Sequence, residues 1–193
     1  MVWTLLSVNT GRIAPFRAAD EPSAIAKRAN PGPVAVGLLG LAGDEQADPV
    51  HHGGADKALH HYPRDHYAAW DRFLGGHALL EGEGAFGENL STLGLTEESV
   101  CLGDRFRLGT ALVEVSHGRQ PCWKLGHRFG EPRVTAEVVS TGRAGWYYRV
   151  LEPGAVAAGD ALALVERPLP DWSVARIFAL VVGGAHRQDP AAV

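Results

Sequence analysis

Turn-forming residues punctuate this chain from end to end and leave room only for short secondary-structure elements. The 24 glycines and 12 prolines are spread along the whole sequence, and such residues mark turns and breaks. Between them lie short segments rich in β-branched and aromatic residues, which is typical of strands. The expected strands are residues 2–8, 34–39, 105–108, 112–116, 134–139, 146–151 and 162–165. Many short strands with few helices favour a mainly β fold, a closed β-barrel.

Two segments predict helices. Pro63 opens the stretch PRDHYAAWDRFL, in which aromatic and apolar residues recur at helical spacing behind a first-turn proline. The second stretch, DWSVARIFALVV, has Ser173 or Asp171 as its N-cap and stops at Gly183. Residues 20–30 fit a short helix or a strand equally well.

One internal echo predicts a barrel corner that is used twice. VCLGDRFRL and VAAGDALAL share the pattern Val-x-x-Gly-Asp-x-x-x-Leu, and in each a Gly-Asp turn leads into a strand. Cys101 stands where the second copy has Ala157, so this position takes a small side chain. We therefore interpret Cys101 as a packing residue, since a buried cysteine behaves as a small hydrophobe.

The totals argue against several classes of protein. A chain of 193 residues suits one domain with a small appendage, here 1–170 and 171–193. A net charge of −4 argues against binding of nucleic-acid polymers, and no apolar run approaches the roughly 18 residues of a membrane span. The N-terminus lacks the features of a signal peptide. Two cysteines are too few for a disulfide framework, so we expect a cytoplasmic protein.

The densest group of reactive side chains is HHGGADKALHHYPRDH, which holds five of the nine histidines. Gly53 and Gly54 lack Cβ atoms, so the backbone there can approach a ligand closely. Exposed amides beside His52 and Lys57 could bind an anion such as phosphate. A turn with solvated histidines explains the same residues. Zinc is a further alternative, although the spacing matches no standard zinc motif.

A second candidate is GRQPCWKL, which follows a predicted strand. The thiolate is the form of cysteine that attacks electrophiles and binds metals, and nearby cations stabilise it. Arg119, Lys124 and His117 flank Cys122 in the sequence. The alternative is a small buried residue beside a core tryptophan.

A third candidate is the stretch GAFGENLST, a glycine-rich turn followed by polar residues. The Asn89 amide offers two donors and an acceptor, which suits contact with a heterocycle. A turn that leads into a strand explains the stretch as well.

Together and in this order, the three stretches resemble the MOSC domain family. HHGGADKALHHYP, GAFGENLSTLGL and SHGRQPCWKL carry the likeness, which extends from the first strand to about residue 170. The similarity is to the bacterial stand-alone branch associated with resistance to 6-hydroxylaminopurine, and it implies a β-barrel. Members of this branch continue into a bundle of C-terminal helices. This chain has the first of them, near Ser173, so we expect a shortened extension over 171–193.

The resemblance also implies a molybdenum cofactor. In the reducing members of the family the cysteine that matches Cys122 ligates molybdenum, and a thiolate suits a metal otherwise held by dithiolene sulfurs. We expect the phosphate of molybdopterin to be held by Lys57, Arg119, Lys124 and the backbone at Gly53 and Gly54. We expect its pterin ring to form hydrogen bonds with His52, His60 or Asn89. His60 and His117 are the candidates for supplying protons.

The predicted function is therefore molybdenum-dependent reduction of small N-hydroxylated compounds such as hydroxylated nucleobases. The chain has no flavin or iron–sulfur module of its own, so a separate reductase must supply electrons. Two alternatives remain open, a sulfur carrier with a persulfide on Cys122 and a module that binds molybdopterin without catalysis. Pyridoxal phosphate has been associated with parts of the family; it would need a Schiff-base lysine such as Lys57 or Lys124, and nothing favours it.

Overall fold

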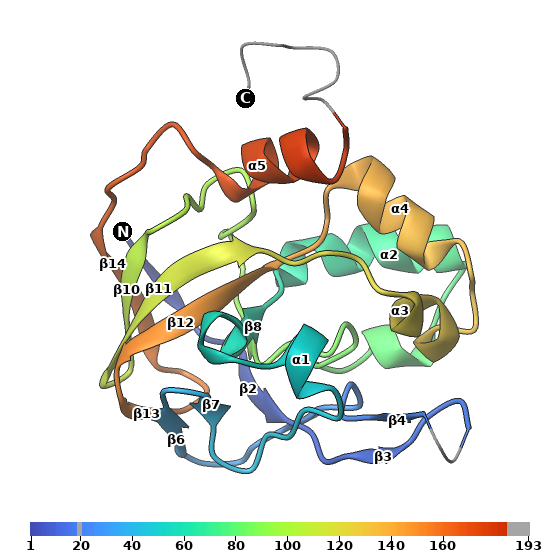
Figure 1. The fold of residues 1–193 in the computed structure, drawn as a ribbon, viewed down its shortest axis with the longest axis horizontal. Coiled ribbons are helices and arrows are strands. Elements are labelled where there is room, and N and C mark those ends of the chain that lie inside the picture. Colours follow the sequence, from blue (N-terminus) through green and yellow to red (C-terminus); the bar gives the residue numbers. More distant parts are fainter. Residues whose placement is uncertain (19–20, 185–193) are drawn as a thin grey trace.

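A curled β-sheet dominates the computed structural model, which describes residues 1–18 and 21–184 (Figure 1). The strands in chain order are β1 (Val2–Thr4), β2 (Ser7–Thr10), β3 (Ala14–Pro15), β4 (Pro22–Ser23), β5 (Arg28–Ala29), β6 (Val34–Gly37), β7 (Gly40–Leu41), β8 (Leu59–His61), β9 (Leu90–Ser91), β10 (Arg105–Leu108), β11 (Ala111–Gly118), β12 (Trp146–Glu152), β13 (Gly154–Val156) and β14 (Ala161–Glu166). The main sheet has nine strands in the order β1-β14-β10-β11-β12-β8-β9-β2-β5. A three-stranded sheet, β13-β6-β7, and the β3-β4 pair complete the β structure.

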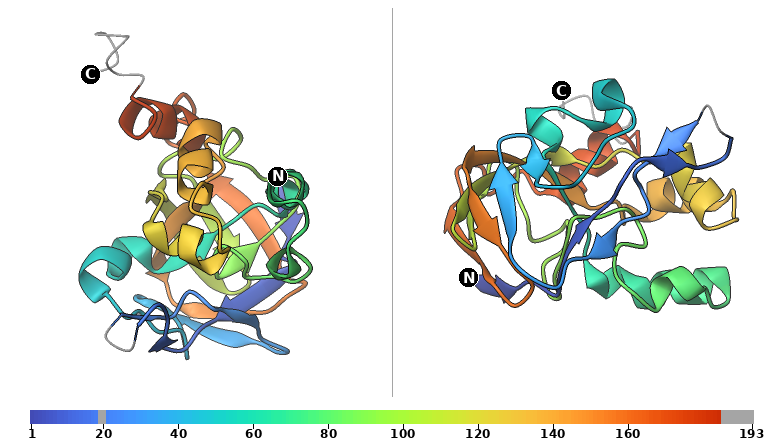
Figure 2. Two further views of the ribbon diagram at one scale, coloured as in Figure 1. Left: turned by 90° about the vertical axis from the view of Figure 1, so that its right-hand side faces the viewer. Right: turned by 90° about the horizontal axis from the view of Figure 1, so that it is seen from below.

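Short helices gather at one end of this sheet (Figures 1 and 2). The α-helices are α1 (Pro49–His52), α2 (Tyr67–Leu74), α3 (Trp123–Arg128), α4 (Val134–Thr141) and α5 (Val174–Val181), and the 3-10 turns are η1 (Ala55–Lys57), η2 (Arg64–His66) and η3 (Ala78–Leu80). No helix within the described residues is long and apolar enough to cross a bilayer.

The mainly β fold is confirmed, but the closed barrel is wrong, because the sheet curls and stays open. Its edge strands are β1 and β5. The strands β1 and β2 are successive segments of the chain that separate at Leu5 and Leu6. The N–H of Leu5 donates to the carbonyl of Asp160 at 3.0 Å, whereas that of Leu6 donates to Ser91 at 2.9 Å. One segment therefore pairs with β14 and the other with β9, and β5 extends the sheet beyond β2.

The other expected strands are present, but residues 134–139 belong to helix α4. Val134 and Val138 lie one helical turn apart, and both are buried in the core beneath the helices. Burial at helical spacing therefore outweighs the β propensity of a valine-rich segment. Gly142, with a left-handed φ of 69°, ends the helix.

Both expected helices form. Pro63 precedes η2 and α2, and the hydroxyl of Ser173 caps α5 by accepting the N–H of Arg176 at 3.1 Å. Residues 20–30, which fitted either kind of element, contain the two short strands β4 and β5. The end of the expected C-terminal extension, residues 185–193, lies outside the described residues.

The two copies of the internal echo make the same turn. Asp104 Oδ2 accepts the N–H of Cys101 at 2.9 Å, and Asp160 Oδ2 accepts the N–H of Ala157 at 2.8 Å. The turns lead into β10 and β14, which pair with each other. Cys101 is buried, as expected of a packing residue.

Two apolar clusters form the core. The first fills the curl of the sheet and includes Phe106 and Tyr148. The second lies beneath the helices and includes Trp70, Phe86 and Phe178. Burial of these large side chains is the main favourable contribution to folding, and it holds in place the loops that carry the candidate site.

Candidate functional site

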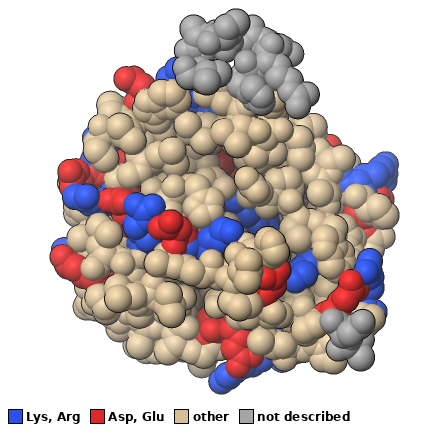
Figure 3. Space-filling model, in the orientation of Figure 1, with Lys and Arg blue, Asp and Glu red and all other residues tan. Residues whose placement is uncertain are grey.

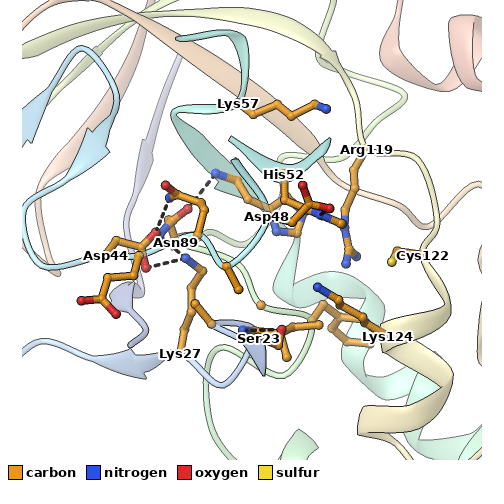
Figure 4. Close-up of a pocket in the computed structure, with 18 of the residues that line it drawn as sticks. Ser23, Lys27, Asp44, Asp48, His52, Lys57, Asn89, Arg119, Cys122 and Lys124 are labelled. Atoms are coloured by element: carbon orange, nitrogen blue, oxygen red, sulfur yellow. Dashed lines mark hydrogen bonds and ion pairs between the residues drawn. The ribbon is translucent and has the colours of Figure 1, made fainter. Parts of the chain in front are cut away.

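One pocket collects most of the predicted site residues. Its space, counting the open solvent at its mouth, measures about 640 Å³. The predicted residues that line it are His52, Lys57, His60, Asn89, Arg119, Cys122 and Lys124. Gly53, Gly54 and His117 are not among the lining residues. Basic side chains are visible near the middle of this face in Figure 3, and Figure 4 shows the pocket itself.

The two glycines shape the loop that carries His52 and Lys57. Gly54 has a left-handed φ of 95°, a conformation that favours glycine. A Cβ on Gly53 would lie 3.0 Å from the backbone of Pro49, so a side chain there would be crowded. Their role in the described structure is thus to turn the chain between α1 and η1.

The Lys57 loop is fastened to the outer face of the sheet through Asp56. Arg149 Nε lies 2.8 Å from Asp56 Oδ1, and the hydroxyl of Ser116 donates to the Asp56 carbonyl at 2.5 Å. The Lys57 ammonium donates to the carbonyl of His51 at 2.5 Å. These contacts position Lys57 at the edge of the pocket.

One side of the pocket, which we call the open wall, is formed by Arg119, Cys122 and Lys124. Arg119 follows β11, and its N–H donates to the carbonyl of Gly145 at 3.0 Å. The Arg119 side chain is buried, yet its Nη1 has no hydrogen-bond partner. Among the described residues, no carboxylate forms an ion pair with Arg119 or Lys124.

The cysteine of the open wall is half-buried and precedes α3. Its carbonyl accepts the N–H of Leu125 at 3.0 Å, which holds the backbone at the start of that helix. In Figure 4 the Cys122 sulfur, the Arg119 guanidinium and the Lys124 ammonium lie together on one side of the pocket. The open wall thus combines a thiol with two cations that lack acidic partners.

The opposite side, which we call the saturated wall, is formed by Lys27, Asp44 and Asn89. The Lys27 ammonium contacts both carboxylate oxygens of Asp44, and the side chains of the pair are only 9% and 1% exposed. The N–H of Gly11 and the Asn89 amide each donate to Asp44 at 2.8 Å. Burial lowers the pKa of Lys27, and the charge of Asp44 opposes that shift. On the saturated wall, the positive charge of Lys27 is therefore neutralised by the carboxylate of Asp44.

Asn89 uses both of its amide donors within the protein. Its Nδ2 donates to Asp44 and, at 3.0 Å, to the carbonyl of Asn9. Its Oδ1 accepts the backbone N–H of His60 at 3.0 Å. This arrangement indicates that Asn89 positions β8 and Asp44, and it leaves no free donor for the ring contact suggested by the sequence.

The two histidines predicted to supply protons lie on either side of Tyr147. The ring of His60 is 5.1 Å from that of Tyr147, and His117 stacks on Tyr147 at 5.2 Å. His60 is buried, and burial together with the charge of Arg119 holds its pKa well below the usual value. Burial and the charge of Lys57 lower the pKa of His117.

Sequence reasoning missed the acidic side of the pocket. Asp44 and Asp48 line it but stand in no recognised motif, and Lys27 lies in a segment of ambiguous secondary structure. The cluster of acids in GDEQAD, just after β7, is the one signal that could have indicated them. Asp48 caps α1 by accepting the N–H of His51 at 3.1 Å, and that bond lowers the pKa of Asp48 to about 2.

The metal-binding side chains of the pocket suit a metal ion that is already coordinated by a cofactor. Within the described residues, no group of three or more His, Cys, Asp or Glu side chains could hold a metal ion. Cys122 is a single soft donor at the pocket. The Nη1 of Arg119, which has no hydrogen-bond partner among the described residues, is a donor that suits an anion. A cofactor with sulfur ligands for the metal and a phosphate for the cations matches these residues.

Comparison with known proteins points to one family. The MOSC domain family model matches residues 48–163. The chain is 48% identical over 162 residues to YiiM from Escherichia coli, which covers 84% of this chain and 72% of YiiM. It is 44% identical over 179 residues to a protein named Reductase from Gibberella moniliformis, covering 92% of this chain but only 32% of that protein. The crystal structure of YiiM from Geobacillus stearothermophilus superposes with a TM-score of 0.80 at 37% identity, covering 98% of this chain and 87% of that one.

Proposed function

The chain belongs to the MOSC domain family, and from that premise we propose that it is a molybdenum-cofactor-dependent reductase of N-hydroxylated compounds. One observation carries the proposal: Cys122 shares the open wall with a buried arginine and a lysine that have no acidic partner within residues 1–18 and 21–184. A buried cation without a partner is costly, so its presence beside a thiol supports binding of an anionic, thiol-ligated group. The relative named Reductase supports the reaction class.

Within this proposal, each part of the open wall has a separate task. The Cys122 thiolate would ligate the metal, and Arg119 with Lys124 would hold the phosphate of molybdopterin through charge-assisted hydrogen bonds. Lys57, at the edge of the pocket, would add a further positive charge. When bound, the cofactor supplies a metal centre that passes two electrons to the substrate.

The substrate class that we propose is small molecules with an N–OH group, including hydroxylated nucleobases. Reduction of this group consumes two electrons, and we propose a separate reductase as the electron donor. We place the reaction in the cytoplasm, where thiols stay reduced, and the free state of both cysteines is consistent with that setting.

Turnover of an N-hydroxylated base tests the proposed function directly. Protein made in cells that synthesise molybdopterin would be given 6-hydroxylaminopurine and dithionite-reduced methyl viologen as an artificial donor, and adenine would be measured by chromatography. We expect turnover by the wild type and none by Cys122→Ser, because the metal ligand is gone. Cys101→Ser, which changes the other thiol, is the matched control.

A sulfur carrier would give a different result in the same preparations. It would release cyanide-labile sulfur from Cys122 without containing molybdenum and without reducing the base. That result, or equal turnover by the wild type and Cys122→Ser, would overturn the reductase proposal. Bound molybdenum with no turnover, even with the reduced donor, would overturn it in favour of a binding module.

A further inference from the structure

The two histidines that line the pocket have different surroundings. His60 is buried, and the positive charge of Arg119 acts on its ring. His52 is half-buried on α1, and its Nδ1 lies 3.5 Å from Asp48 Oδ2. A carboxylate beside an imidazole favours the protonated ring, and of the two only His52 has one. The pocket therefore contains a histidine that is both open to a ligand and paired with an acid.

The His52–Asp48 pair is built into the first turn of α1. Asp48 is the N-cap residue just before α1 and His52 is the last residue of this single turn, which brings their side chains within ion-pair distance. Asp48 is itself held by the backbone N–H of His51. With Nδ1 turned toward Asp48, Nε2 is the ring nitrogen available to a ligand. Figure 4 shows His52 beside Asp48, next to Arg119. The 3.5 Å separation is an ion-pair distance, and Nδ1 has no hydrogen-bond partner among the described residues. Hydrogen bonds of catalytic groups are often long before a ligand binds.

We propose that His52, oriented by Asp48, is the catalytic acid that protonates the departing oxygen of the N–OH group. This assignment rests on the proposed function. In the step, the N–O bond breaks as a separate reductase supplies two electrons, and the oxygen leaves as water with its own hydrogen and one proton from His52 Nε2. The nitrogen takes the second proton from solvent, which also reprotonates His52. The balance is R₂N–OH + 2e⁻ + 2H⁺ → R₂N–H + H₂O.

The charges around His52 make the assignment testable by pH. Asp48 and His51 lie on its own helix, and Lys124 and Arg119 face it from the open wall. Burial and Lys124 lower the pKa of His52, whereas Asp48 raises it. A catalytic acid works only while protonated, so kcat should fall as the pH rises through this pKa. Asp48→Asn should move that fall to lower pH, and Lys124→Met should move it to higher pH.

The experiment compares His52→Gln with His51→Gln. His51 is an exposed neighbour whose Nδ1 lies 2.9 Å from the same Asp48 carboxylate, so it is a matched control. Adenine formation would be followed between about pH 5 and 9, a range that brackets histidine titration, and divided by the molybdenum content of each variant. We expect His52→Gln to keep its molybdenum, to lose roughly 10²-fold or more in kcat, and to lose the alkaline fall. His51→Gln should match the wild type.

A second readout does not depend on a loaded cofactor. The histidine ring signals of the cofactor-free protein would be titrated by NMR, with His52→Gln identifying the His52 signal. We expect this signal to titrate at lower pH in Asp48→Asn and at higher pH in Lys124→Met. Unchanged titration in both variants, or a His52→Gln enzyme with wild-type kcat and pH profile, would overturn the assignment. A wild type that never reduces the base would instead overturn the proposed function.

Discussion

The open wall and the saturated wall face each other across one pocket, but they treat charge in opposite ways. On the saturated wall, Lys27 is matched by Asp44, which also accepts three further hydrogen bonds. On the open wall, Arg119 and Lys124 have no acidic partner among the described residues, and one guanidinium nitrogen is buried without any bond. Buried charges are normally paired. The fold itself therefore neutralises the charges of the saturated wall, whereas within the described residues it leaves those of the open wall without counter-charges.

Removing the acid of the saturated wall should have the largest effect. Asp44→Asn leaves the buried Lys27 ammonium without its counter-charge, and breaking a buried pair in this way costs about 3–5 kcal/mol in the free energy of unfolding. Urea denaturation measures the loss. The double variant Lys27→Met/Asp44→Asn removes both charges, keeps an acceptor oxygen at position 44 for the N–H of Gly11, and should recover part of it. If Asp44→Asn is as stable as the wild type, the Lys27–Asp44 ion pair does not stabilise the saturated wall.

Removing the Arg119 cation from the open wall should weaken ligand binding and leave the stability of the fold nearly unchanged. Arg119→Ala deletes a buried charge that has no carboxylate partner, so we expect the unfolding midpoint in urea to stay near that of the wild type. Loss of a charge-assisted hydrogen bond of about 1.5–3 kcal/mol corresponds to roughly 10–100-fold weaker cofactor retention. Molybdenum content after dialysis measures it. Unchanged content would remove Arg119 from the site.

Acid should destabilise the fold through the buried histidine next to the saturated wall. His61 adjoins His60 on β8, stacks on Trp146 at 4.4 Å, and is fully buried. Burial lowers its pKa from 6.5 to about 3, so the unfolded chain binds one more proton than the folded protein between these values. The free energy of unfolding should therefore fall with decreasing pH, by up to about 1.4 kcal/mol per pH unit for this group.

His61→Phe checks that contribution. The variant keeps an aromatic ring against Trp146 but cannot bind a proton, so its stability should fall less steeply than that of the wild type below pH 6.5. Urea unfolding at a series of pH values measures both slopes. His51→Gln, which changes an exposed histidine, should keep the wild-type slope. Equal slopes in His61→Phe and wild type would show that His61 does not carry the effect.

The second cysteine should give the smallest effect. Cys101 is buried in the turn before β10 and donates to the carbonyl of Pro170 at 3.4 Å. Cys101→Ala removes one sulfur atom from packing and should cost about 1 kcal/mol of stability, with turnover of 6-hydroxylaminopurine close to wild type. A loss of activity as large as that from Cys122→Ser would reverse our ranking of the two thiols.

The sequence predicted the strands better than it predicted how they join. Strands such as β10 and β12 are short runs of β-branched and aromatic residues bounded by turn residues, so local pattern identifies them. Helix α4 was missed because Val134 and Val138 have β propensity, and only tertiary burial shows that they share a helical face. The two open edges of the sheet, β1 and β5, could not be predicted either, since they depend on pairing between strands far apart in the sequence.

The open wall could be predicted and the saturated wall could not, for a related reason. Arg119, Cys122 and Lys124 lie within six consecutive residues of one recognisable stretch. Lys27 and Asp44 are 17 residues apart in segments without a clear motif, and only the fold brings them together. Spatial arrangement likewise separated His52, which lines the pocket, from His117, which lies behind Tyr147.

The molybdenum content of the purified protein tests the central claim most directly. Wild type, Cys122→Ser and Cys101→Ser would be made in cells that synthesise molybdopterin and analysed for metal by mass spectrometry, with circular dichroism to confirm that each is folded. The account predicts stoichiometric molybdenum in the wild type and Cys101→Ser, and almost none in Cys122→Ser. Molybdenum retained by Cys122→Ser, or absent from the wild type, would contradict it.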